Sequence, residues 1–422
     1  MVIFLNLVLV IEIVLVFGLL MFIHELGHFI FAKRAGIFVR EFSLGLGPKI
    51  FSVKKNETQY SLRILPFAAY VRMAGEDPEL LDISTGQIIG FNLNAKKEVQ
   101  DIFQQKEKAD NSFKVEEIDL EHKLFIKGSD EEENIIYYPI ARDTVIHYEN
   151  NKQVQIAPWD RQFGSKSVRA KFAAVLAGPV FNIILAIILF FALSMMTGIP
   201  TNKIIVQEIT ENSPAEEAGL IQDDTVLGIE GMEFKTFEEL IMKIQTSPGE
   251  NLKFIVDRNG ERMIVPITPK KDEGQETALI GVKFEGIYRD ATFSESASNS
   301  LNKTAQMTAV IFQGFKMILS GHVGMDDVVG PVGIIQVTSD FAQRGIADLT
   351  WWGAVLSLYL GIFNLLPIPA LDGSRLLFLT LEGIRGKPVD PQKESMVHLV
   401  GFAFLMLLMI VVTFNDISRL FQ

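Results

Sequence analysis

Four stretches of the chain are almost free of charged residues over the length that a membrane-spanning helix requires. They run from Val2 to Ile23, from Phe172 to Thr197, from Leu349 to Leu371 and from Met396 to Phe414. Because about 20 apolar residues span the hydrocarbon core of a bilayer, each stretch predicts one transmembrane helix. With their flanks, we place the four segments at residues 1–35, 170–198, 349–373 and 394–416. The pattern therefore predicts a polytopic α-helical membrane protein.

The first connecting stretch, residues 36–75, alternates apolar and polar positions on both sides of Pro66. Such alternation is typical of two strands and predicts a β-hairpin. The part from Ile64 to Val71 is apolar enough to dip into the membrane, where a strand edge is tolerated only if it is buried in protein or lines a polar cavity. We therefore expect a membrane-associated hairpin that follows the first transmembrane segment.

The other connecting stretches predict two domains and one amphipathic region. Residues 76–157 are acidic and rich in strand patterns, which favours a solvated cytoplasmic insertion over a regulatory one. Residues 203–289 combine several strand patterns with one helical pattern and predict a compact extracytoplasmic domain. Residues 300–348 are amphipathic and are expected to lie on the outer membrane surface, where a packing role is favoured over a recognition role.

Lysine and arginine residues at the segment ends set the orientation. Lys33 follows the first charge-poor stretch, Arg169 and Lys171 precede the second, and Arg385 lies between the third and fourth. Short flanks rich in Lys and Arg face the cytoplasm. Both termini and the long stretch 200–348 are therefore expected outside.

Net charge and cysteine content limit the partners and the metal ligands that the chain can have. The formal net charge of the 422 residues is −12, which argues against nucleic acid as a partner. The chain has no cysteine, so a bound metal would need ligands from histidine, aspartate or glutamate.

The first apolar stretch contains the motif His24-Glu25-Leu26-Gly27-His28. Residues four positions apart lie on one face of a helix, so both imidazoles can reach one ion. The neighbouring Glu25 carboxylate can then take the proton of a water molecule that a zinc ion activates. Ionisable side chains within a membrane are rare and usually functional. We therefore predict a hydrolytic zinc site here rather than a hydrogen-bonded polar pair.

Asp372 is the candidate for a third ligand. It follows Pro367 and Pro369, which break the third apolar segment near its cytoplasmic end. His24 lies about 14 Å of helix before Lys33, so both groups belong to the cytoplasmic half of the membrane. The alternative is that Asp372 only caps the helix that follows it. The other four histidines have no partner at ligand spacing and are expected to be structural.

Together these motifs resemble the site-2 protease family of intramembrane zinc metalloproteases, in its bacterial RseP/RasP branch. The resemblance rests on HELGH, on GPVFN from Gly178 to Asn182, on GPVGI from Gly330 to Ile334 and on NLLPIPALDG from Asn364 to Gly373. The stretch from Ser213 to Val226 is similar to PDZ domains, which accept peptides beside a sheet edge. The acidic insertion and the single PDZ-like domain resemble the Gram-positive RasP form of this branch.

The resemblance implies regulated intramembrane proteolysis in the bacterial cytoplasmic membrane. The substrates would be single-pass membrane proteins, such as anti-sigma factors already trimmed outside, and remnant signal peptides. It assigns a zinc ion to His24, His28 and Asp372 and the role of general base to Glu25. The PDZ-like domain would contact a peptide or protein, or exclude substrates with a large external part. Substrate contacts are expected from Leu65, Pro66, Phe67, Asn182, Asn364 and Pro369.

Two other classes of protein remain as alternatives. A non-catalytic membrane scaffold with a PDZ domain would not need His24, Glu25 and His28 together. A transporter would be expected to show paired half-length helices or inverted repeats, and neither is visible in the sequence. The protease interpretation is therefore preferred.

Overall fold

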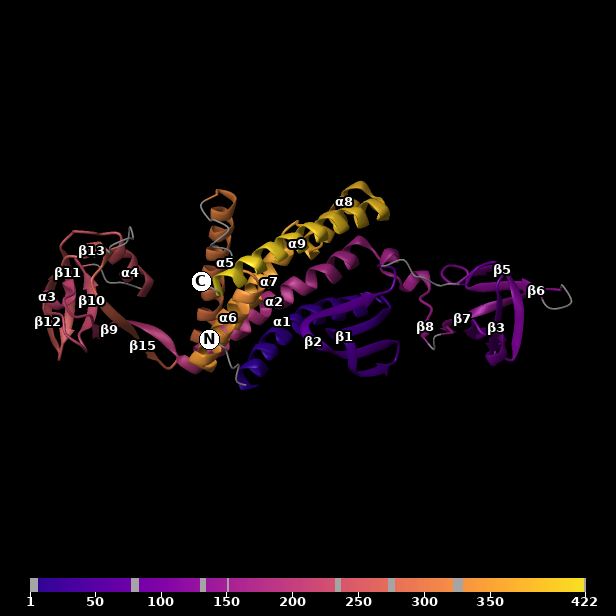
Figure 1. Cartoon of the computed structure of the whole chain (residues 1–422), viewed down its shortest axis with the longest axis horizontal. Coiled ribbons are helices and arrows are strands. Elements are labelled where there is room, and N and C mark those ends of the chain that lie inside the picture. The colour runs from indigo at the N-terminus through magenta and orange to yellow at the C-terminus, as the bar shows by residue number, and fades with distance from the viewer. Residues whose placement is uncertain are drawn as a thin grey trace. The chain divides into compact units, whose positions relative to one another are not determined.

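The structure is a computed structural model that describes residues 7–76, 83–129, 134–149, 152–231, 237–271, 278–321 and 329–420. Figure 1 traces its elements. The chain forms two compact units, of which one contains Met1–Ala186 and Met307–Gln422 and the other contains Ile187–Gln306. All four residues of the predicted zinc site belong to the first unit.

Within the described residues, four helices are long and apolar enough to cross a membrane, as the charge-poor stretches predicted. They are α1 (Leu7–Arg34), α2 (Val168–Thr197), α7 (Ile346–Leu365) and α9 (Pro391–Leu420). Helix α7 ends at Leu365 because Leu366 takes an extended conformation before Pro367, as residues before proline usually do. Residues 1–6, where the first predicted segment begins, lie outside the described residues.

Three further helices accompany the spanning helices, and one of them continues from the second unit into the first. Helix α5 (Phe293–Leu319) and helix α6 (Pro331–Arg344) fall in or near the region predicted to be amphipathic, and α8 (Asp372–Arg385) follows the proline-rich loop. The backbone N–H groups at the start of α6 find their hydrogen-bond acceptor on another helix. The buried Asp416 carboxylate of α9 accepts hydrogen bonds from the backbone N–H groups of Gly330 at 3.1 Å and Gly333 at 2.9 Å. These donors have no partner inside α6, so the contact joins α9 to α6.

Strands β1 (Val39–Lys55) and β2 (Thr58–Met73) form the hairpin region. Both strands bend, so that residues 39–44 of β1 pair with residues 69–73 of β2 on one side and with residues 59–62 on the other. The outer part of β1 pairs again with residues 58–63. The two strands therefore form a small sheet of four segments. Within the described residues, no further strand pairs with Ala69–Met73, which leaves that segment as an edge.

The insertion folds into a small closed barrel with its own core. Its strands are β3 (Ile88–Leu93), β4 (Val99–Phe103), β5 (Asn111–Asp119), β6 (Phe125–Ser129), β7 (Ile135–His147) and β8 (Gln153–Gln155). Neighbouring strands pair in the order β4-β3-β5-β6-β7-β8, and a parallel pairing of β4 with β7 closes the ring. The core contains fully or almost fully buried Ile89, Phe91, Ile102, Ile126 and Ile146. Short 3-10 turns, η2 (Trp159–Arg161) and η3 (Phe163–Ser165), lead from the barrel to α2.

The second unit contains a five-stranded antiparallel sheet with two helices. The strand order is β12-β11-β10-β9-β15, and the bounds are β9 (Ile199–Ile209), β10 (Thr225–Ile229), β11 (Leu252–Arg258), β12 (Glu261–Ile267) and β15 (Val282–Arg289). Helices α3 (Pro214–Glu217) and α4 (Phe237–Gln245) accompany the sheet. The core combines alternate strand residues with Ala215 of α3 and with Leu240 and Ile244 of α4. Alternation of apolar residues along the strands thus builds one buried face.

Candidate metal centre

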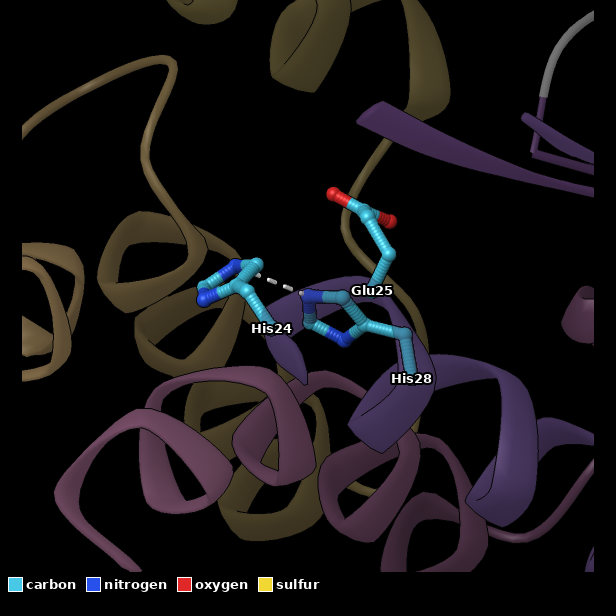
Figure 2. Close-up of side chains that lie close together, drawn as sticks. All are labelled: His24, Glu25 and His28. Atoms are coloured by element: carbon cyan, nitrogen blue, oxygen red, sulfur yellow. Dashed lines mark hydrogen bonds between the residues drawn. The ribbon is translucent and has the colours of Figure 1, made fainter. Parts of the chain in front are cut away.

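Helix α1 brings His24 and His28 together on one face. The two residues are 6% and 7% exposed, and their Nε2 atoms lie 3.2 Å apart. Figure 2 shows the two rings close together and joined by a dashed line, with Glu25 extending from the same part of the helix, and the ring planes meet at 78°. The possible ligand atoms of His24, Glu25 and His28 all lie within 4.8 Å of one another. The four-residue spacing therefore produces the convergence that the sequence predicted.

Asp372, the first residue of α8, completes the group. Its Oδ2 atom lies 3.1 Å from His24 Nε2 and 3.4 Å from His28 Nε2. Gly373 lets the start of α8 pack against the end of α7, because a Cβ at that position would lie 2.5 Å from the backbone oxygen of Leu365. The interpretation of Asp372 as a simple helix cap does not fit, since the structure places it at the first helical position and directs its carboxylate to the histidines.

The Nε2 atoms of His24 and His28 and the Oδ2 atom of Asp372 have the spacing of ligands to a single zinc ion. Tetrahedral ligand atoms at about 2.0–2.1 Å from zinc stand roughly 3.3 Å from one another, and the observed separations are 3.1, 3.2 and 3.4 Å. Three heavy atoms in such a small triangle cannot form three linear hydrogen bonds. Two imidazoles and a carboxylate are also a ligand set that zinc accepts. His24, His28 and Asp372 could therefore hold one zinc ion and leave a fourth position open.

Hydrogen bonds behind the two rings orient them. His28 Nδ1 donates to the backbone oxygen of Ala174 at 2.9 Å, which leaves Nε2 of the neutral ring free to bind a metal. His24 Nδ1 lies 3.1 Å from the side-chain amide of Asn182, whose Oδ1 atom is buried without a partner among the described residues. A turn of 180° about the last side-chain bond exchanges the amide O and N atoms. With Oδ1 toward His24, Asn182 accepts from Nδ1–H and directs the Nε2 lone pair to the metal position.

Two glycines let α1 and α2 approach at the level of the site. A Cβ at Gly27 would lie 2.7 Å from the backbone carbon of Ala177, and a Cβ at Gly178 would lie 2.5 Å from Cε1 of His28. Real Cβ contacts are longer than these distances. The glycines of the HELGH and GPVFN motifs are thus required by the close packing of the two helices around the His28 ring.

The edge segment of the hairpin runs beside Glu25. The backbone of Val71 lies within hydrogen-bonding reach of the Glu25 carboxylate. Tyr70, Val71 and Arg72 line a cavity of about 1140 Å³, which Ala370 and residues of α8 and α9 also line. Arg375 of α8 forms an ion pair with Glu76, three residues after β2. An accessible strand edge is therefore anchored next to the predicted catalytic group.

The six predicted substrate contacts occupy different surroundings. Leu65 is 52% exposed in the bend of the hairpin, and the side chains of Pro66 and Phe67 lie outside the described residues. Asn364 is half-buried, and its Nδ2 donates to the backbone oxygen of Leu360 at 3.0 Å. The expectation that Asn182 contacts substrate does not fit the structure, because its side chain is fully buried against His24.

One histidine outside the predicted ligand set lies beside the site. His398, which the sequence left as a structural residue, accepts through Nδ1 a hydrogen bond from the backbone N–H of Ala370, two residues before Asp372. The signal available in the sequence was its place in the fourth apolar segment, where ionisable side chains are rare. Another histidine in that group of four, His322, lies outside the described residues.

Comparison with known proteins identifies the family. The profile of Peptidase family M50 matches residues 12–408. The chain belongs to Peptidase family M50. It is 42% identical over 417 residues to "Zinc metalloprotease RasP" of Geobacillus kaustophilus, and the match covers 98% of each chain. It is 41% identical to "Regulator of sigma-W protease RasP" of Bacillus subtilis, over 98% of this chain and 99% of that protein.

Membership in Peptidase family M50 makes the protein a membrane-embedded zinc metalloprotease of the site-2 protease type. Zinc is therefore its metal, as the donor set already indicated. A solved PDZ domain of an SdrC-like protein from Listeria monocytogenes is 21% identical, covers 20% of this chain and 90% of that one, and has a TM-score of 0.19. That score is too low to support an argument about the second unit.

Proposed function

We propose that this M50 metalloprotease cleaves peptide bonds within the transmembrane segments of single-pass membrane proteins. The observation that carries the proposal is the convergence of His24, His28 and Asp372 at 3.1–3.4 Å, with two of the three donors inside a helix apolar enough to span a bilayer. Anti-sigma factors and remnant signal peptides are the proposed substrate classes. The printed name of the Bacillus subtilis relative, a regulator of sigma-W protease, supports the first of these.

His24, His28 and Asp372 are the proposed zinc ligands, and Glu25 is the proposed general base. A zinc ion held by these residues would act as a Lewis acid that polarises the scissile carbonyl and activates a water molecule. Glu25 takes the proton of that water and later delivers a proton to the leaving amine. Asn182 and Ala174 hold the two rings in the required tautomer. Asn364 is proposed to contact the substrate backbone or the developing oxyanion.

The hairpin edge is the proposed binding site for the extended substrate. A peptide bond in a transmembrane helix is shielded by the helix's own hydrogen bonds, so the substrate must first unwind. Residues 69–73 form a sheet edge beside Glu25 to which no other strand of the described residues pairs, and an added strand could pair with it. The ion pair between Glu76 and Arg375 supports this role because it ties the end of β2 to the helix that begins with Asp372.

The outer part of the hairpin is proposed to dip into the lipid. Its exposed large apolar side chains support this placement, since such a patch on a surface normally marks an interaction site; they are Leu46, Ile50, Phe51, Val53, Leu62, Ile64 and Leu65.

The distribution of basic residues supports an orientation with both termini outside the bacterial cytoplasm. The second unit would then lie outside as a PDZ-like domain that contacts the substrate or excludes those with a large external part. Its compact sheet and two helices are consistent with that role.

The test is cleavage of a truncated single-pass reporter by the purified full-length protein and by Glu25→Gln, with the zinc content of both measured. We expect the variant to keep zinc and lose cleavage, because Glu25 is not one of the three converging ligands. If both proteins process the reporter equally, the mechanism is wrong and a non-catalytic membrane scaffold becomes the better interpretation. A reporter that retains its external domain tests the size filter and should be cleaved more slowly.

A further inference from the structure

Helix α9 contacts the loop that leads to Asp372 at two points. The backbone N–H of Ala370 donates a hydrogen bond to His398 Nδ1 at 3.2 Å. Three residues further along α9, Gly401 packs directly against Pro369, because a Cβ at that position would lie 3.0 Å from Pro369 Cα and closer still to its Cβ. One hydrogen bond and one close contact therefore link α9 to the residues just before Asp372.

Ala370 takes a backbone conformation that needs such support. Its φ angle is +73°, in the left-handed region that is sterically unfavourable for a residue with a Cβ. Conformations of this kind persist when the surrounding structure holds them. The bend at Ala370 turns the chain from Pro369 into α8, and α8 begins with Asp372. The orientation of the Asp372 carboxylate therefore depends on this bend.

The chemistry of the contact fixes the tautomer of His398. A backbone N–H can only donate, so Nδ1 must accept and the proton of the neutral ring lies on Nε2. Nε2 lies 3.8 Å from a Glu394 carboxylate oxygen, one turn earlier on α9. Phe378 of α8 packs against the ring of His398, with the two ring centroids 5.8 Å apart. The ring is therefore held between its own helix and α8 with its acceptor atom directed at Ala370.

We propose that His398 is a positioning residue for the zinc site. By accepting from the Ala370 N–H, it holds the left-handed bend and thereby keeps the Asp372 carboxylate on His24 and His28. The proposal rests on the proposed role of Asp372 as a zinc ligand. It assigns to the fourth apolar helix a part in the metal centre, although that helix contributes no ligand.

The test compares two amide variants of the full-length protein. In His398→Asn the side-chain oxygen can occupy the position of Nδ1, whereas in His398→Gln the amide reaches the position of Nε2 and leaves the Ala370 N–H without its acceptor. Both variants keep a polar neutral side chain in the same space. Val400→Ala, at a position on the same helix that is 64% exposed, is the control for changes in α9 itself.

We expect His398→Gln to lower kcat for the reporter and to hasten zinc loss to a chelator by about 10- to 100-fold, the usual effect of removing support behind a metal ligand. KM should not change, since the hairpin edge is intact. His398→Asn should stay within about three-fold of wild type. Ala370→Gly should restore much of the activity of His398→Gln, because glycine adopts positive φ readily.

Two results would overturn the proposal. One is equal loss in His398→Asn and His398→Gln, which would mean that the ring acts by packing alone. The other is full activity and normal zinc retention in His398→Gln. Glu25→Gln is assayed in parallel, so that failure of the proposed function, seen as unchanged cleavage by that variant, is distinguished from failure of the positioning role.

Discussion

Replacing Gly178 by alanine should disturb the metal centre from a neighbouring helix. The added Cβ would lie 2.5 Å from Cε1 and 2.9 Å from Cδ2 of His28. Comfortable carbon contacts require about 3.5 Å or more, so the imidazole must move by about 1 Å or the two helices must separate. Metal–ligand distances tolerate only about 0.2 Å. The His28 ring would therefore leave the position in which it can share an ion with His24 and Asp372.

The expected loss of function is larger than the loss of stability. Overpacking costs about 1–3 kcal/mol, and replacing glycine within a helix returns up to about 1 kcal/mol. Gly178→Ala should therefore fold, with a free energy of unfolding at most about 2–3 kcal/mol lower. Zinc affinity and cleavage should nevertheless fall by at least about ten-fold, because a ligand is displaced.

The assay measures zinc stoichiometry, reporter cleavage and thermal unfolding of the full-length protein in detergent. Gly18→Ala is the matched control, since it makes the same substitution in α1 at a position where a Cβ meets no atom within 4 Å. That variant should keep zinc and activity. If Gly178→Ala also retains zinc and cleaves within two-fold of wild type, the close packing of α2 against the His28 ring is not what the site requires.

Three other substitutions test contacts around the site. Lys171→Met should lower the free energy of unfolding by about 3–5 kcal/mol, because the carboxylate of Glu382, which Lys171 binds at 2.6 Å, then loses its buried partner. The double variant Lys171→Met/Glu382→Leu should recover most of the lost stability in thermal melts. Asn182→Leu should weaken zinc retention about 10- to 100-fold in chelator competition, whereas Asn182→Asp should keep it. Burial would raise the pKa of Glu57, but hydrogen bonds from Arg161 and Lys33 outweigh burial and hold it below its usual range. The resulting stabilisation is present above the unfolded-state pKa of about 4.3 and is lost as the pH falls below it, so melting temperatures measured from pH 7 to 3.5 should fall less in Glu57→Gln than in wild type.

Local sequence patterns were sufficient to predict the four spanning helices and the two histidines of the site. A run of apolar residues determines a spanning helix whatever surrounds it, and the spacing of His24 and His28 places both on one face of α1 by helix geometry alone. The position of Asp372 followed from a comparison of depths in the membrane. These inferences needed no knowledge of which helix packs against which.

Features that depend on packing between distant segments could not be read from the sequence. The parallel pairing of β4 with β7 and the double pairing of residues 39–44 join strands whose patterns fit several registers. The contact of Asn182 with His24 depends on where α2 crosses α1, and Asn182 was therefore assigned to the substrate. The contact of His398 could not be predicted for a similar reason, since nothing in its local sequence reveals the N–H of Ala370.

The separation of the three converging ligands along the chain has a mechanical consequence. His24 and Asp372 are 348 positions apart, so an ion held at the proposed site would tie the first helix of the chain to the start of α8. Such a tie acts as a reversible cross-link, and it stabilises the folded bundle in proportion to how tightly the ion binds. Under a pulling force applied at one end, the zinc-loaded protein should release α1 only when that link breaks.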